Sequence, residues 1–189
     1  MHPARYNPPP KLSNPITLTV AAQIQELGLH SAVLGQHGAA AQRLLQILLA
    51  AKSRGADIPP IVRISARGLP EGVMAYLTPY ARPVLQIHPD IFTLDWFAEG
   101  CAGCPIFHEL GHYGHWRFLR DQAYLRMAKR TLTPAQKLIA GEVSEAATED
   151  PCEFVAESFA GLAAGHQYSA AVSRLYAHLG GPQPIQPKS

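Results

Sequence analysis

The chain has 189 residues, of which 47% are hydrophobic and 16% are charged, and its formal net charge is +2 at pH 7. This length and composition fit one globular domain and exclude a disordered chain. The small net charge predicts neither a nucleic-acid partner nor a membrane partner, and the longest apolar run, residues 44–51, is too short to cross a bilayer. No basic and apolar leader opens the sequence, so we expect a cytoplasmic protein, or one exported without a cleaved signal peptide.

Proline and glycine mark the two ends of the expected domain. Residues 1–15 contain five prolines, which predicts a flexible or extended arm without a hydrogen-bonded ladder. Residues 181–189 have the same character and are expected to form a tail. The region between them, residues 16–180, is interpreted as a single domain.

The N-terminal half of this domain combines a helix with short strands. A short helix is expected around residues 20–26, and a longer one over 39–53, where leucines recur at helical spacing. Three β-branched or alternating runs separated by glycine and proline then predict strands at 61–65, 72–77 and 83–88.

The C-terminal half is predicted to be helical. Proline and capping residues place four helices at about 105–127, 134–147, 151–163 and 168–179. The order of helix, sheet and helices predicts an α+β domain with a small mixed or antiparallel sheet of about three to four strands.

The stretch His108-Glu109-Leu110-Gly111-His112 lies near the start of the helix predicted over 105–127. Positions i and i+4 share one helix face, so the two imidazoles can reach one metal ion. Glu109 stands beside them, where a carboxylate can take a proton from metal-bound water. This HExxH pattern predicts a zinc cofactor on His108 and His112 with Glu109 as the catalytic base. The competing interpretation is an amphipathic helix whose histidines are exposed or hydrogen-bonded in the core.

A catalytic zinc ion usually has three protein ligands and one open position, so one ligand is missing from this pair. Metzincins carry a third histidine six residues after the second, where this chain has Phe118, which excludes that class. His115 would crowd the metal if it joined the pair, and we expect it to line the cleft or to be exposed.

An acidic helix downstream offers better ligands. Glu153 and Glu157 lie one turn apart among apolar residues, and two such carboxylates repel each other unless a cation holds them. We expect Glu153 to be the third ligand and Glu157 to hydrogen-bond a ligand histidine. The other interpretation makes Asp150 and Glu153 a helix-capping pair with Glu157 solvated. The remaining ligand candidates are Glu149, Asp150 and Glu157.

The chain has three cysteines, Cys101, Cys104 and Cys152. Their low and odd number argues against a disulfide scaffold. A lone CxxC pair is weak support for a zinc ribbon, and buried or idle thiols are favoured over redox control.

HELGH, followed about forty residues later by EFVAESF, resembles the motifs of the gluzincin zinc metallopeptidases, and among them the catalytic domain of anthrax lethal factor and related toxin-type HExxH peptidases. The likeness covers roughly residues 104–118 and 148–162. It implies a zincin-like fold and an endopeptidase, of the kind that serves as a bacterial effector or toxin, that hydrolyses a protein or peptide substrate. It also implies that an edge strand beside the active-site helix binds substrate backbone by strand addition, for which we expect the strand at 82–88.

Position by position, the resemblance implies that His108, His112 and Glu153 bind zinc and that Glu109 is the general base. It also implies that Glu157 hydrogen-bonds a ligand histidine. There is one departure: the lethal-factor pattern has a tyrosine seven residues before the ligand glutamate as oxyanion donor, and this chain has Ala146. The remaining oxyanion candidates are Tyr168, His166, His115 and Tyr113.

Three other interpretations stay open. The regulatory peptidases of the IrrE/ImmA type also begin HELGH and use a downstream acidic helix. The chain could instead be a non-catalytic zincin-like structural or binding domain. A structural zinc site could also form from Cys101, Cys104, His108 and Cys152. A run of basic residues after the motif is interpreted as a solvated helix face rather than a steering surface for an acidic substrate.

Overall fold

The computed structural model describes residues 19–33, 38–78, 82–92 and 105–182. These residues form seven α-helices and a four-stranded mixed sheet, which confirms the predicted α+β class and the predicted sheet size. The proline-rich arm and residues 183–189 lie outside the described residues. No helix within the described ranges is long and apolar enough to cross a membrane.

The first part of the chain forms a short helix, followed by a unit of strand, helix and strand. Helix α1 spans Val20–Leu27, strand β1 Ser31–Val33, helix α2 Gly38–Ser53 and strand β2 Ile61–Ile64. Strands β1 and β2 are parallel and α2 connects them, so the predicted helices are confirmed. Strand β1 was not predicted, because three residues are too few to show an alternating pattern. Leu44, Leu45 and Leu48 of α2 are fully buried in the core, and Leu49 is partly buried against it.

Strands β3, Ala75–Thr78, and β4, Val84–Ile87, complete the sheet in the order β1-β2-β4-β3. Strand β4 runs parallel to β2 and antiparallel to β3. The expectation that residues 82–88 form the edge strand beside the active-site helix is therefore wrong: β4 is interior and β3 is that edge. The error arose because an alternating pattern marks a strand without giving its neighbours. A short 3-10 helix, Pro89–Phe92, follows β4.

The long helix expected over 105–127 is two helices. Helix α3 spans Pro105–Leu119 and helix α4 spans Asp121–Met127. Between them Arg120 has φ 67° and ψ 165°, a backbone conformation that residues other than glycine rarely adopt. The indole nitrogen of Trp116 donates to the carboxylate of Asp121 across this break, at 2.8 Å. The basic side chains that follow the motif are exposed, as expected of a solvated face: Arg117, Arg120, Arg126, Lys129 and Arg130.

Three further helices complete the C-terminal half. They are α5, Pro134–Ala140, α6, Pro151–Ala163, and α7, Ala170–His178. Each begins after a side chain that accepts hydrogen bonds from the first turn, namely Thr133, Asp150 and Ser169. Helix α5 is shorter than predicted, because the chain turns at Gly141 and continues into a 3-10 helix over Ala146–Thr148.

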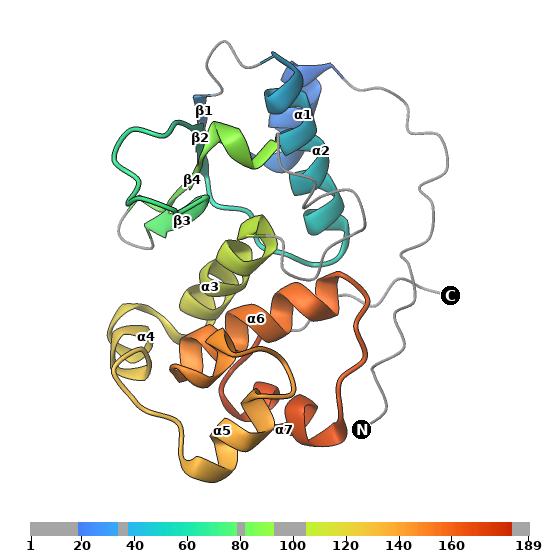
Figure 1. Cartoon of the computed structure of the whole chain (residues 1–189). Coiled ribbons are helices and arrows are strands. Elements are labelled where there is room, and N and C mark those ends of the chain that lie inside the picture. The colour runs from blue at the N-terminus through green and yellow to red at the C-terminus, as the bar shows by residue number, and fades with distance from the viewer. Residues whose placement is uncertain (1–18, 34–37, 79–81, 93–104, 183–189) are drawn as a thin grey trace.

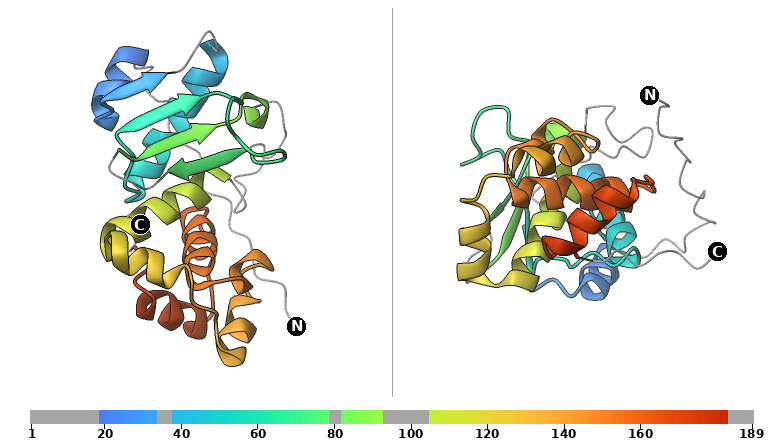
Figure 2. Two further views of the ribbon diagram at one scale, coloured as in Figure 1. Left: turned by 90° about the vertical axis from the view of Figure 1, so that its left-hand side faces the viewer. Right: turned by 90° about the horizontal axis from the view of Figure 1, so that it is seen from below.

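Helix α3 lies between the two halves of the molecule. Figure 1 shows the sheet with α1 and α2 on one side of α3, and α4 to α7 on the other. The left view of Figure 2 shows the same division, with α3 running along the β3 edge of the sheet. Helix α3 packs against β3 on one face and against α6 on another. The HExxH residues are therefore held between the sheet edge and the later acidic helix.

The crossing of α3 and α6 depends on Gly111. A Cβ atom at this position would lie 2.8 Å from Cα and 3.0 Å from the carbonyl oxygen of Ala156. Because these are backbone atoms of a packed helix, they cannot move aside as a flexible side chain would. The absence of a side chain at Gly111 therefore permits the helix separation at which α3 and α6 meet.

We predict that Gly111→Ala destabilises the fold by about 1–3 kcal/mol, since overpacking outweighs the gain in helix propensity. Gly38→Ala is the matched control, because a Cβ there meets nothing within 4 Å. Thermal unfolding of both variants tests this. Equal melting temperatures would show that the two helices can separate without cost.

Candidate metal centre

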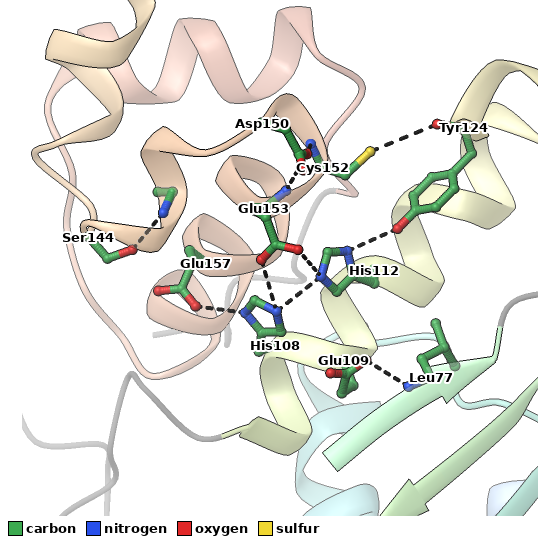
Figure 3. A network of polar contacts seen from close by, with 11 residues as sticks. Leu77, His108, Glu109, His112, Tyr124, Ser144, Asp150, Cys152, Glu153 and Glu157 are labelled. Carbon is green, nitrogen blue, oxygen red and sulfur yellow. Dashed lines mark hydrogen bonds and ion pairs between the residues drawn. The ribbon is translucent and has the colours of Figure 1, made fainter. Parts of the chain in front are cut away.

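Three side chains from α3 and α6 converge on one point. The Nε2 atoms of His108 and His112 are 3.0 Å apart. Glu153 Oε2 lies 3.3 Å from His108 Nε2, and Glu153 Oε1 lies 3.2 Å from His112 Nε2. Figure 3 shows the Glu153 carboxylate directed at both imidazoles. The one-turn spacing of α3 aligns the histidines, and the crossing at Gly111 brings the first turn of α6 to them.

These separations match the edges of a zinc coordination tetrahedron. Bonds of about 2.0–2.2 Å to nitrogen and oxygen place two tetrahedral ligands about 3.3 Å apart. The three ligand atoms all lie within 4.8 Å of one another, and among the described residues no other group of His, Cys, Asp and Glu ligands of this size occurs. A single proton can form a hydrogen bond between only two of these three groups, whereas a divalent cation can be bonded by both imidazoles and the carboxylate. The residues present therefore fit a zinc ion.

Each histidine is held from behind by a second hydrogen bond. His108 Nδ1 lies 2.7 Å from Glu157 Oε1, and His112 Nδ1 lies 3.0 Å from the Tyr124 hydroxyl. With both Nδ1 atoms engaged, the Nε2 atoms face the centre of the cluster. Such outer partners fix ring orientation and tautomer in metal sites and raise ligand basicity. The structure thus places Glu157 where the sequence predicted it, one turn beyond Glu153.

Tyr124 was missed by sequence reasoning. It lies on α4, twelve residues after His112, and the uninterrupted helix that the sequence predicted would have carried it away from the cluster. The break at Arg120 turns α4 back, so that the buried Tyr124 reaches His112. No glycine or proline marks the break, so the sequence offers no signal for it.

The cluster is partly open to solvent. The side chains of His108, His112 and Glu153 are 20%, 12% and 28% exposed. A structural zinc site is usually closed by four protein ligands, whereas a catalytic site keeps one position open. Three converging ligands with access to solvent are therefore typical of the catalytic kind.

The charges of the cluster balance one another. Burial disfavours the imidazolium of His108, but hydrogen bonds to Glu153 and Glu157 outweigh it and raise the pKa of His108 to about 10. Burial also disfavours the Glu153 carboxylate, yet hydrogen bonds from His108 and His112 hold its pKa well below the usual range. Hydrogen bonds from His108 and Ser144 lower the pKa of Glu157 as well. In the metal-free protein, a proton on His108 thus takes the place of the cation.

Glu109 lies on a neighbouring face of α3 and points to the sheet. Its Oε2 accepts the backbone N–H of Leu77, in β3, at 2.8 Å. Burial raises the pKa of Glu109, against the attraction of His112 and His108 and the Leu77 hydrogen bond. A carboxyl with an elevated pKa beside a metal site is suited to accept and return protons.

The other acidic candidates have different roles. The carboxylate of Asp150 accepts the backbone N–H groups of Cys152 and Glu153, at 2.6 and 3.1 Å, and so caps α6. Glu153 points to the histidines instead of completing a capping box. Glu149, the other ligand candidate, ends the 3-10 helix before α6 and is not a member of the group of converging ligand atoms.

The oxyanion candidates lie in three places. The Tyr168 hydroxyl packs over Gly161 of α6, and burial and the charges of Glu157 and Glu142 raise its pKa to about 12. The His166 ring lies beside that of Tyr168. Tyr113 stacks on Trp116, and the guanidinium of Arg117 lies over its ring. Of the four, Tyr168 packs on the helix that carries Glu153 and Glu157.

His115 differs from its expected position. It is fully buried, and its Nε2 donates to the carbonyl oxygen of Leu179 at 2.9 Å. The expectation that it lines the cleft or is exposed is wrong, because the α3 face that carries it is covered by the C-terminal part of the chain. Burial lowers its pKa to about 4, so the ring is neutral.

Cys152 is buried, and its thiol points to the carbonyl oxygen of Tyr124 rather than to the histidines. Burial and the charges of Asp150 and Glu153 raise its pKa to about 12, so the thiol stays protonated and is a poor metal ligand. Cys101 and Cys104 lie outside the described residues. The structural zinc site of three cysteines and His108 gains no support from Cys152.

The raised pKa of His108 predicts that zinc binding depends on pH. Below pH 10 a proton on His108 must leave before zinc binds, so zinc affinity should rise by up to about tenfold per pH unit between pH 6 and 9. Calorimetry in buffers of different ionisation enthalpy should show release of about one proton at pH 7.5. Glu157→Gln removes one of the groups that raise the pKa of His108, so it should release less. An affinity independent of pH would contradict the assignment.

Tyr124→Phe should lower zinc affinity about tenfold, because His112 loses the partner that orients its ring. Tyr176→Phe is the matched control: Tyr176 is also buried, and its hydroxyl bonds the Pro182 carbonyl instead of a cluster residue. Competition with a chromophoric chelator measures both affinities. An equal loss in the two variants would mean that the effect is one of general stability.

Comparisons with protein-family models, with curated proteins and with solved structures find no match to this chain. Any functional assignment therefore depends on the geometry of the His108, His112 and Glu153 cluster.

Proposed function

We propose that the protein is a zinc-dependent endopeptidase with a zincin-like fold. The observation that carries the proposal is the convergence of His108, His112 and Glu153 at separations of 3.0–3.3 Å, with solvent access to the cluster. This is the ligand set implied by the resemblance to gluzincins, and it leaves one position for the reacting groups.

His108, His112 and Glu153 would hold the zinc ion, which supplies Lewis acidity to activate water and polarise a carbonyl. Glu157 and Tyr124 orient the two histidines from behind. Glu109 acts as general base: it takes a proton from the attacking water and then gives it to the departing amine. Tyr168, over Gly161, is the favoured candidate for stabilising charge on the substrate oxygen.

The edge of the sheet beside α3 is β3, and not residues 82–88 as the sequence had suggested. Glu109 accepts the backbone N–H of Leu77, one of the outward groups of this strand. Because α3 already engages this edge, strand addition of a peptide along β3 is not part of the proposal. The peptide substrate is supported by the resemblance of the two motifs to those of the gluzincins.

The test separates metal binding from catalysis. We expect Glu109→Gln to bind zinc as the wild type does and to lose at least about a thousandfold in peptide cleavage, since a general base contributes about 10²–10⁴ and the attacking water also loses its orientation. Glu153→Gln should instead lose zinc, measured by elemental analysis after dialysis.

Cleavage is followed by comparing peptides released from a denatured proteome by wild type and the Glu109 variant. The matched control is Glu26→Gln, which changes an exposed glutamate of α1. A wild type that binds zinc and releases the same peptides as Glu109→Gln would show a non-catalytic zinc-binding domain.

A further inference from the structure

Strand β3 presents backbone groups to α3 at alternate residues. The amide of His88 donates to the carbonyl of Met74, so these two residues form a hydrogen-bonded pair in the antiparallel ladder. Such pairs alternate along an antiparallel ladder. Tyr76, opposite Gln86, is therefore the next hydrogen-bonded residue, and the amides of Ala75 and Leu77 point away from β4.

One of these two outward amides meets the HExxH helix. Leu77 donates its N–H to Glu109 Oε2 at 2.8 Å. Figure 3 shows the Glu109 side chain directed at Leu77, whereas the carboxylates of α6 are directed at the histidines. The contact joins the edge of the sheet to the residue between the two ligand histidines.

A base that moves protons must present one oxygen steadily to the reacting water. A carboxylate side chain has freedom about its terminal bond, and an anchor on one oxygen removes that freedom. A backbone amide is a better anchor than a side chain, because the strand already fixes it. With Oε2 on Leu77, the geometry leaves Oε1 to exchange the proton.

We propose that the Leu77 backbone amide is the positioning group for Glu109, so that the sheet edge orients the base of this site. The inference rests on the proposed function. It assigns to β3 a role in the reaction that does not depend on its pairing with a peptide. Leu77 acts through its main chain, so the role is independent of its side chain.

The test removes the backbone N–H of Leu77 and leaves its side chain unchanged. Leu77→leucic acid, introduced as an α-hydroxy acid, exchanges the N–H for an ester oxygen and keeps the side chain. Ala75→lactic acid is the matched control: it lies on the same strand, its side chain is also buried, and its N–H also points outward. Both esters weaken the preceding carbonyl, which in each case bonds β4, so that effect cancels in the comparison.

We expect the Leu77 ester to lower kcat about tenfold with zinc affinity unchanged, and the Ala75 ester to leave kcat within about twofold of the wild type. An effect on substrate binding alone would appear in KM and not in kcat. Equal kcat values for the two esters would overturn the inference.

A second measurement needs no catalysis. In the zinc-free protein, Glu109→Ala should speed hydrogen exchange of the Leu77 amide at least about tenfold and leave the Ala75 amide unchanged. Unchanged exchange at Leu77 would show that the contact does not hold in solution. If the wild type cleaves no peptide, both the proposed function and the role of Leu77 are contradicted. If the wild type cleaves peptides and the two esters have equal kcat values, only the role of Leu77 is contradicted.

Discussion

The contact between the backbones of α3 and α6 at Gly111 is the constraint on which the rest of the site depends. Ligand atoms of a small cation must lie within a few ångströms of one another, and short side chains on two helices reach that distance only if the helices nearly touch. A glycine within the HExxH stretch supplies this closeness. The same residue therefore serves core packing and metal geometry, and the apolar faces on both sides of it, with Leu110 and Phe159, bury the crossing.

Around this contact, charge is arranged in pairs. Glu153 and Glu157 would repel each other on an apolar helix, but each faces an imidazole of α3. His108 bonds to both carboxylates, which is why its proton is held so firmly in the absence of a metal. Glu109 lies on a neighbouring face of α3 and is held by the sheet instead. The proposed ligands and the proposed base thus depend on different parts of the fold.

Several of these features could be read from the sequence, because they are local. The spacing of His108 and His112 fixes one helix face, and the like charges of Glu153 and Glu157 indicate a cation nearby. The features that were missed are not local. The order of the strands depends on pairings between distant segments, so an alternating run such as 83–88 cannot show whether it lies at the edge. Arg120 has a positive φ, which an arginine in the sequence does not predict. Because the helix break was not predicted, the hydrogen bond between Tyr124 and His112 was not predicted either.

The distance along the chain between the proposed ligands links metal binding to the stability of the fold. His112 and Glu153 are 41 residues apart, 153 − 112, and belong to separate helices. An ion bonded to both would join α3 to α6, and these ligands are brought together only in the folded chain. Binding of the ion would therefore stabilise the crossing of the two helices, and any change that loosens the crossing would lower the affinity for the ion.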